Sequence, residues 1–342
     1  KHDINVLGGW SAEENLYEDL QGKRTNIVGN ELPALNLGDT DGWSNAADEN
    51  EWALLSGFMR ASYAFAAKYL VEVNFRADAS SRFSKKNRWG VFPSASVGWR
   101  ITEEKFMQNQ HIFDNLKLRA SWASVGLPFG RFLANPTFEW DFSTGAYKSQ
   151  AAYPLYELKP ERTESWEVGL TARFLKYFNF DVSFYNTKTY NQTVDAQLSP
   201  TGGYNKFYAQ TGEVRNRGVE LSLEFKNTWN KFTWNSNYTF SANKNKILSL
   251  IDGYVNPVTG ETISKERLEV GGLANAKFLL KVGGSLGDLY SVKDLVRDSN
   301  NNIYVDEEGK VVINEKAGDI FLGSVFPKAN MAWRNDFQYG NW

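Results

Sequence analysis

The feature that most constrains this chain is an alternation of apolar and polar residues that recurs in segments of about ten residues. From Tyr69 to Asp78 the odd positions are aromatic, valine or alanine, and the even positions are charged or polar except Leu70. The same alternation runs through residues 165–174 and 219–226. Because successive side chains of a β-strand point to opposite faces, the pattern predicts strands with one apolar and one polar face.

These segments are long for strands of a soluble sheet. Ordinary strands average about five to six residues, whereas a tilted strand that crosses a bilayer needs about nine to eleven. We therefore expect a membrane-crossing sheet. We place its strands near residues 4–10, 55–66, 69–78, 91–101, 116–125, 164–175, 178–190, 213–226, 231–243 and 328–339.

The connections between these strands alternate in length. The short ones include Ala67-Lys68 and Lys176-Tyr177, and residues 102–115, predicted to hold a single helical turn, lie on the same side. Tight turns on one side and extended loops on the other are typical of antiparallel outer-membrane barrels. The long loops are expected at about residues 11–54, 79–90, 127–160, 191–212 and 244–327.

The composition agrees with a barrel and excludes other classes. Aromatic residues make up 15% of the chain, yet its mean hydropathy is −0.48, as expected when each strand faces lipid on one side and water on the other. A net charge of −2 argues against nucleic acid as a partner. Rings near the predicted strand ends suit aromatic girdles at the two membrane surfaces. They are Tyr63, Tyr69, Trp99, Trp122, Trp166, Tyr177, Trp333 and Trp342.

Several motifs, in this order along the chain, resemble those of SusC-like TonB-dependent transporters (the SusC/RagA type). The resemblance covers nearly the whole chain. The motifs are residues 55–65, Lys68-Tyr69-Leu70, Arg76 to Phe83, Arg88 to Ser94, Trp99-Arg100-Ile101, Leu116 to Trp122, Leu158 to Gly169, Gly212 to Glu220 and Phe326-Pro327-Lys328.

The resemblance implies an all-β fold, an antiparallel transmembrane β-barrel of about 22 strands that encloses an N-terminal plug. The present chain supplies about ten strands and no plug-like segment. We therefore expect residues 1–342 to be a partial barrel domain, a C-terminal portion that lacks the plug and the final strands. An open sheet would leave unpaired edges in lipid, at a cost of several kcal/mol for each unsatisfied backbone group.

The resemblance also implies a function. It predicts a nutrient importer in the bacterial outer membrane, in contact with lipid and lipopolysaccharide, that takes up an oligosaccharide or a peptide. A SusD-like surface lipoprotein would cap the loops, and TonB would act through the missing plug. No bond is made or broken in that scheme, so we expect no enzyme activity.

Two alternatives remain open at this stage. The first is a non-transporting outer-membrane barrel that serves as a structural or secretion-complex component, because such a protein would share every strand feature. The second is a soluble glycan-binding β-sandwich, which would bury the apolar faces of its strands inside.

Candidate ligand contacts lie among the aromatic residues of the long loops, because sugar rings stack their CH faces on aromatic rings. The same rings could instead pack a loop onto itself or onto a capping partner. We name as candidates Trp140, Phe142, Tyr147, Tyr153, Tyr204, Phe207 and Tyr208, from a set that also includes Phe129, Phe132 and Phe138.

No motif predicts a catalytic, cofactor or metal site. The oxygens at Asp298, Asn300 and Asn302 have the spacing of a calcium loop, but Ile303 stands where such a loop needs glycine, so a polar hairpin is the better interpretation. The adjacent pair Glu103-Glu104 would point to opposite faces of a strand, which does not suit a pair of hydrolytic carboxylates.

Overall fold

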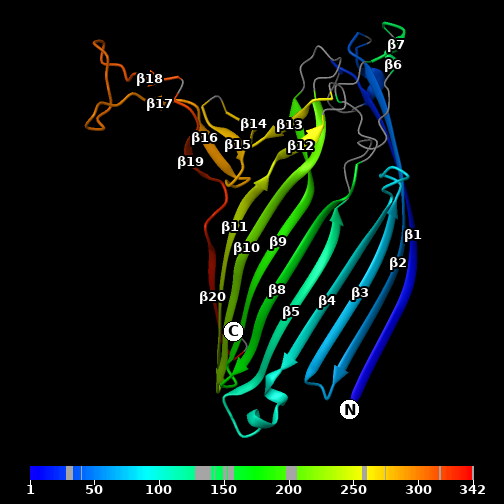
Figure 1. Ribbon diagram of the computed structural model, residues 1–342, viewed down its shortest axis with the longest axis vertical. Coiled ribbons are helices and arrows are strands. Elements are labelled where there is room, and N and C mark those ends of the chain that lie inside the picture. The colour runs from blue at the N-terminus through cyan, green and yellow to red at the C-terminus, as the bar shows by residue number, and fades with distance from the viewer. Residues whose placement is uncertain are drawn as a thin grey trace.

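The computed structural model describes residues 1–27, 34–39, 41–127, 140–141, 143–148, 152, 158–197, 206–255, 260–273, 275–315 and 317–340. Its main element is one antiparallel sheet of ten long strands (Figure 1). These are β1 His2–Lys23, β2 Ser44–Phe65, β3 Tyr69–Ser80, β4 Trp89–Arg100, β5 Phe113–Leu127, β8 Glu161–Phe174, β9 Phe178–Gln197, β10 Lys206–Trp229, β11 Phe232–Ser249 and β20 Asn330–Tyr339.

The strands are ordered in the sheet as they occur in the sequence, with β1 at one edge and β20 at the other. Each strand pairs antiparallel with its neighbour, so the sheet is an up-and-down meander. In Figure 1 the tight connections and the first residue lie at the lower end, and the long connections lie at the upper end. The fold therefore confirms the partial antiparallel barrel expected from the alternation.

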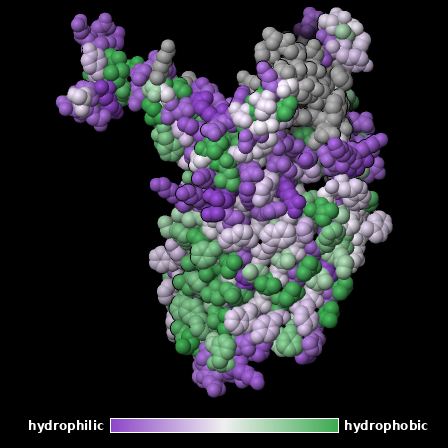
Figure 2. Space-filling view, viewed as in Figure 1, coloured by the Kyte–Doolittle hydropathy of each residue, from purple (hydrophilic) through white to green (hydrophobic). Residues whose placement is uncertain are grey.

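One face of the sheet carries a continuous apolar surface. A single row of register partners crosses all ten strands, and all but the first of its members are apolar or aromatic. The row is His2, Phe65, Tyr69, Trp99, Leu118, Leu170, Val182, Leu221, Phe240 and Met331. Figure 2 shows the hydrophobic band as a green zone in the lower half of the molecule, between hydrophilic regions above and below.

This apolar surface is open to the surroundings rather than packed. Val73, Phe75 and Phe184 are each 50–55% exposed. No second sheet among the described residues covers them. The alternative of a soluble sandwich does not fit this sheet, because a sandwich would bury these side chains between its two layers.

Aromatic rings form a belt at the lower end of the sheet. Neighbouring ring centroids lie 5.0–6.2 Å apart along the belt. Such a belt fits the girdle that aromatic residues form at a membrane surface. Its members are Phe113, Phe174, Phe178, Phe225, Trp229, Phe232, Trp234 and Phe337.

Two of the long connections are shorter than expected. Strands β1 and β2 continue as a ladder to the pair Lys23–Ser44, so most of the predicted loop 11–54 is strand. Likewise β9 reaches Gln197 and β10 begins at Lys206, within the predicted loop 191–212. In the β1–β2 hairpin, the strand ends within this predicted loop carry charged and polar side chains on both faces. Backbone pairing holds these strand ends together, and because neither face is apolar, the sequence shows no alternation there.

The predicted loop 244–327 contains a small sheet of its own. Its strands are β14 Arg267–Gly272, β15 Lys277–Lys281, β16 Asp288–Ser291 and β19 Ile320–Ser324, and it is flanked by two-stranded pairs. The pairs are β12 Ile251–Val255 with β13 Thr262–Lys265, and β17 Asp294–Leu295 with β18 Ile313–Asn314.

A cluster of buried apolar side chains lies where this small sheet meets the upper ends of β10 and β11. Ile247, Leu250 and Val214 are at most 4% exposed, and Leu268 and Leu280 pack against them. The hydrophobic core therefore anchors the loops to the barrel wall instead of filling the barrel.

The lower end holds one longer connection, between β4 and β5. It forms two 3-10 turns, η2 Ile101–Glu103 and η3 Lys105–Met107, in place of the single helical turn expected there. Glu104 joins the two turns and accepts hydrogen bonds from the hydroxyl of Tyr69 and the indole of Trp99. These bonds lower the pKa of Glu104, with the Tyr69 hydroxyl contributing most. No helix in the described part of the chain is long and apolar enough to cross a membrane.

Candidate functional site

The face of the sheet opposite the apolar band is polar, and it is the main candidate for function. Two adjacent hollows of about 540 and 460 Å³ lie along it. Both hollows are lined by Arg119 of β5 and Glu167 of β8. The first extends toward β3 through Glu72, and the second extends toward β10 through Glu220. The strand alternation places these side chains inward, because each follows or precedes an outward apolar residue.

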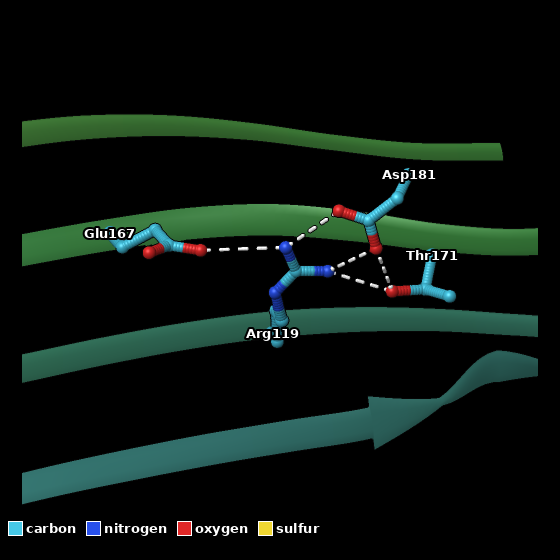
Figure 3. A network of polar contacts seen from close by, with 4 residues as sticks. All are labelled: Arg119, Glu167, Thr171 and Asp181. Atoms are coloured by element: carbon cyan, nitrogen blue, oxygen red, sulfur yellow. Dashed lines mark hydrogen bonds and ion pairs between the residues drawn. The ribbon is translucent and has the colours of Figure 1, made fainter. Parts of the chain in front are cut away.

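Arg119 is the centre of a polar network that crosses three strands (Figure 3). Its guanidinium donates to both carboxylate oxygens of Asp181, at 2.7 and 2.8 Å, which is a bidentate pair. It also donates to the hydroxyl of Thr171 at 2.7 Å and to Glu167 at 3.4 Å. The Thr171 hydroxyl in turn donates to Asp181 at 2.6 Å. The network fixes one cation between two carboxylates on the inner wall.

Glycine makes this arrangement possible. The register partners of Arg119 are Gly98 on β4 and Gly169 on β8. A Cβ atom at Gly169 would lie 2.6 Å from the guanidinium carbon of Arg119. Since no real Cβ approaches that closely, the side chain of Arg119 can lie across the strand only because residue 169 has none.

Other charges of the inner wall are paired in the same way. Arg60 of β2 forms an ion pair with Glu72 of β3, and its Nε donates at 2.9 Å. Arg76 donates to both oxygens of Asp78, at 2.8 and 2.9 Å, and to the hydroxyl of Ser56. The wall is therefore highly polar, but these charges are largely neutralised by partners on the same wall.

The structure brings together two of the predicted loop aromatics. Trp140 and Tyr147 lie in a short hairpin of β6 Trp140–Asp141 and β7 Ala146–Tyr147, at the upper end in Figure 1. Their rings meet edge to face with centroids 5.0 Å apart, and both stay exposed, Tyr147 by 65%. The two rings therefore contact each other, as expected if the loop packs onto itself, but part of each ring is left exposed.

The other predicted site residues are placed differently or not described. Tyr208 lies in β10, partly buried and opposite Asp195 of β9, and Phe207 belongs to the same strand. Both are therefore strand residues rather than loop residues. Phe142, Tyr153 and Tyr204 lie outside the described residues, as do Phe129, Phe132, Phe138 and Trp342. For all seven candidate residues, the role as ligand contacts stays a prediction.

The acidic hairpin around Asp298 holds itself together. One oxygen of Asp298 accepts from the backbone N–H groups of Asn300 and Asn302, and the other accepts from the Asn302 side-chain amide. These hydrogen bonds lower the pKa of Asp298, that from the Asn302 amide most. The carboxylate is thus used as a turn acceptor, in agreement with the hairpin interpretation. No group of three potential metal ligands occurs among the residues for which the structure gives positions.

Sequence reasoning did not find the Arg119 network. Its members are 62 residues apart at the widest, and only the registers of β5, β8 and β9 bring them together. One signal was available. Arg119, Glu167 and Asp181 take inward positions on three consecutive predicted strands, and the middle strand carries a glycine at Gly169, which together could have suggested a pairing across the strands.

Known proteins with a similar sequence or fold cover most of this chain. A family model described as "TonB dependent receptor-like, beta-barrel" matches residues 2–311. The chain is 32% identical over 308 residues to the TonB-dependent receptor P39 of Formosa agariphila, covering 86% of the chain and 27% of that protein. It is 30% identical over 314 residues to the TonB-dependent receptor SusC of Bacteroides thetaiotaomicron, covering 84% of the chain and 30% of that protein.

Among solved structures, the RagAB peptide importer in its open-open state matches 99% of this chain and 37% of the importer chain. The TM-score is 0.79 at 20% identity, which shows a common fold. The chain thus spans between about a quarter and two fifths of the length of the relatives it matches.

Proposed function

The chain belongs to the TonB-dependent receptor-like β-barrel family, whose SusC-type members are outer-membrane proteins, and from this premise we propose that it forms part of the wall of a nutrient importer. The imported ligand is an oligosaccharide or a peptide. The wall works with a plug domain on which TonB acts, and with a SusD-like lipoprotein that covers the loops from outside.

The observation that carries this proposal is the two-faced wall. The outward row from Phe65 to Met331 suits hydrocarbon, and the inward face around Arg119 suits water or a polar occupant. A barrel that only fills itself with side chains would need an apolar interior. A polar interior with hollows of several hundred Å³ fits a barrel that encloses a separate domain and passes a polar ligand.

The pairing of charges within the wall supports a moving plug. Arg119, Asp181 and Glu167 satisfy one another without any partner from outside the sheet. If a plug carried the counter-charges instead, its displacement would have to break each of those ion pairs. A wall that neutralises itself lets the plug move at a smaller cost.

The sheet edges support assembly with more strands. The outer edges of β1 and β20 have no partner strand among the described residues. In hydrocarbon every unpaired backbone group costs several kcal/mol. We propose that the rest of a longer protein, as in the relatives of about three times this length, supplies the strands that close the barrel and the plug within it.

Two kinds of ligand are consistent with this wall. The RagAB structures are named as a peptide importer, and a likeness at 20% identity bears on fold rather than on cargo. The exposed ring pair of Trp140 and Tyr147 would suit a sugar, because CH groups stack on aromatic faces. We therefore place oligosaccharides before peptides.

The test is growth and uptake. The gene of the full-length protein is deleted in its host, and uptake of labelled oligosaccharides and of labelled peptides is measured in parallel, with and without TonB. Loss of uptake of one ligand class that requires TonB, restored by the gene, supports the proposal. Normal uptake of every ligand after deletion would instead favour the non-transporting structural component.

A further inference from the structure

The turn between β3 and β4 is strongly cationic. Residues 82–88 read Arg-Phe-Ser-Lys-Lys-Asn-Arg, with four cations and no acidic residue. The turn is well fixed. The backbone N–H of Ser81 donates to the carbonyl of Ala53 at 2.9 Å, the Asn87 amide donates to the carbonyl of Leu158 at 3.2 Å, and Phe83 is 5% exposed. Its side chains are therefore held in place on the barrel wall.

Two of the four cations line a pocket at the upper end of the wall. The pocket has a volume of about 220 Å³, and Arg82 and Arg88 border it together with Trp52 and Phe92. The guanidinium of Arg82 lies 4.7 Å from the ring centroid of Trp52, a cation–π contact. The pocket thus combines aromatic surface with two positive charges.

One nitrogen of each of these arginines lacks a hydrogen-bond partner among the described residues. The Nε atoms of Arg82 and Arg88 are buried and have no hydrogen-bond partner among the described residues, and the same holds for the hydroxyl of Ser84. Buried donors without acceptors are rare, because each costs about 1–3 kcal/mol. Both arginines at the pocket therefore keep a donor that no described residue uses.

The acidic residue at the pocket does not fill this role. Asp78 also lines the pocket, but both of its oxygens accept from Arg76 at 2.8–2.9 Å. That pair is neutral, so among the described residues that line the pocket the charges of Arg82 and Arg88 are in excess.

The pocket is shaped by glycine. The ring of Phe92 occupies the space that a Cβ would take at Gly90 and at Gly126, 2.4 Å away in both cases. The ring of Phe92 therefore lies over the backbone of Gly90 and Gly126, where it forms one side of the pocket. A side chain at either glycine would push the ring into the pocket.

We propose that this pocket binds an oxyanion, a carboxylate or a sulfate ester, carried by an acidic sugar that the barrel admits. Guanidinium groups bind such oxygens through short charge-assisted hydrogen bonds, and Trp52 and Phe92 supply surface for the sugar ring. The biological meaning of the site rests on the proposed import function, but the binding does not.

The test uses the full-length protein purified in detergent and isothermal titration with three probes. Trigalacturonic acid carries carboxylates, glucose 6-sulfate carries a sulfate ester, and maltotriose is the neutral control. We expect one or both acids to bind more tightly than maltotriose, and the acid that binds identifies the source of the oxyanion. Acids that bind no better than maltotriose overturn the proposal.

Variants locate the binding. Arg82→Gln and Arg88→Gln should each weaken acid binding about tenfold to a hundredfold, the effect of losing a charged hydrogen bond, whereas Arg82→Lys should retain part of it. Lys85→Gln is the matched control, because Lys85 is an exposed cation of the same turn that does not line the pocket. Equal losses in Arg82→Gln and Lys85→Gln would show diffuse attraction instead of a site.

Two further measurements separate the possible failures. If the arginine variants do not fold, a salt titration of the unaltered protein still tests the site. Raising the salt concentration from about 0.05 M to 0.5 M should weaken binding of the acid and leave the affinity for maltotriose unchanged. An affinity for the acid that does not depend on salt contradicts the site. Binding in detergent without uptake by cells refutes import but leaves the pocket. Uptake of acidic and neutral sugars alike, without charge-dependent binding, refutes the pocket alone.

Discussion

The two-faced wall can be tested with one pair of substitutions at neighbouring positions of β4. Ala95 faces outward, with Val73 and Trp122 as its register partners. Ser96, the next residue, faces inward between Glu72 and Ser121 and lines the larger hollow. Arginine introduced at the two positions adds the same charge and the same volume one residue apart.

The magnitude follows from the depth of Ala95 in the apolar band. Ala95 lies four residues above Trp99, which is next to the last residue of β4 at the lower end of the sheet. At about 3.3 Å per residue and a tilt of about 40°, this is about 10 Å, close to the middle of an apolar band about 25 Å tall. Arginine at that depth costs about 2–4 kcal/mol, less any cation–π contact with Trp122. At Ser96 the new guanidinium faces Glu72, so we expect a change within about 0.5 kcal/mol.

The assay is urea unfolding of the full-length protein in lipid vesicles, followed by the mobility shift of folded barrels in unheated gels. Ala95→Arg should lower the free energy of unfolding by at least about 2 kcal/mol, and Ser96→Arg should unfold close to the unaltered protein. If Ser96→Arg is the more damaging of the two, the assignment of faces is wrong.

Three further expectations follow from the described contacts. Asp319, held by Arg267 at 2.7 Å, has its pKa lowered to about 2 mainly by that hydrogen bond. Since the ordinary value is about 3.9, its contribution to the small loop sheet is complete above about pH 4 and lost as the pH falls toward 2. Hydrogen-exchange protection factors in β14, which correct for the intrinsic pH dependence of exchange, should therefore fall over that range, and Asp319→Asn should remove this fall. In a double-mutant cycle of Arg119→Met and Asp181→Asn, unfolding should give a coupling energy of about 1 kcal/mol, because both side chains are partly exposed; coupling near zero contradicts a structural role for the pair. Trp140→Ala should leave the barrel folded and weaken binding of an identified ligand up to about tenfold, and unchanged affinity would assign the ring to loop packing alone.

The sequence by itself determined the strands of the wall and their faces. When apolar residues alternate with polar ones over ten residues and one face must meet lipid, only one assignment of the side chains to the two faces is possible. The ends of β3 and β20 could therefore be predicted to within about two residues. It did not determine how far β1 and β2 extend beyond the membrane. There both faces meet water, and backbone pairing such as Lys23 with Ser44 leaves no hydrophobic signature.

Only the tertiary structure decided which polar side chains meet. Arg119 and Asp181 are far apart in the sequence, and their contact depends on the registers of β5, β8 and β9 and on the missing side chain of Gly169. Arg82 and Arg88 are close in the sequence, which shows them only as part of a cationic run, but the pocket that they share with Trp52 and Phe92 depends on the pairing of β2, β3 and β4. The alternation of apolar and polar residues can be read along one strand, because each position must suit either lipid or water. A contact between polar side chains of two strands depends on the register between those strands, and that register is set by the whole sheet.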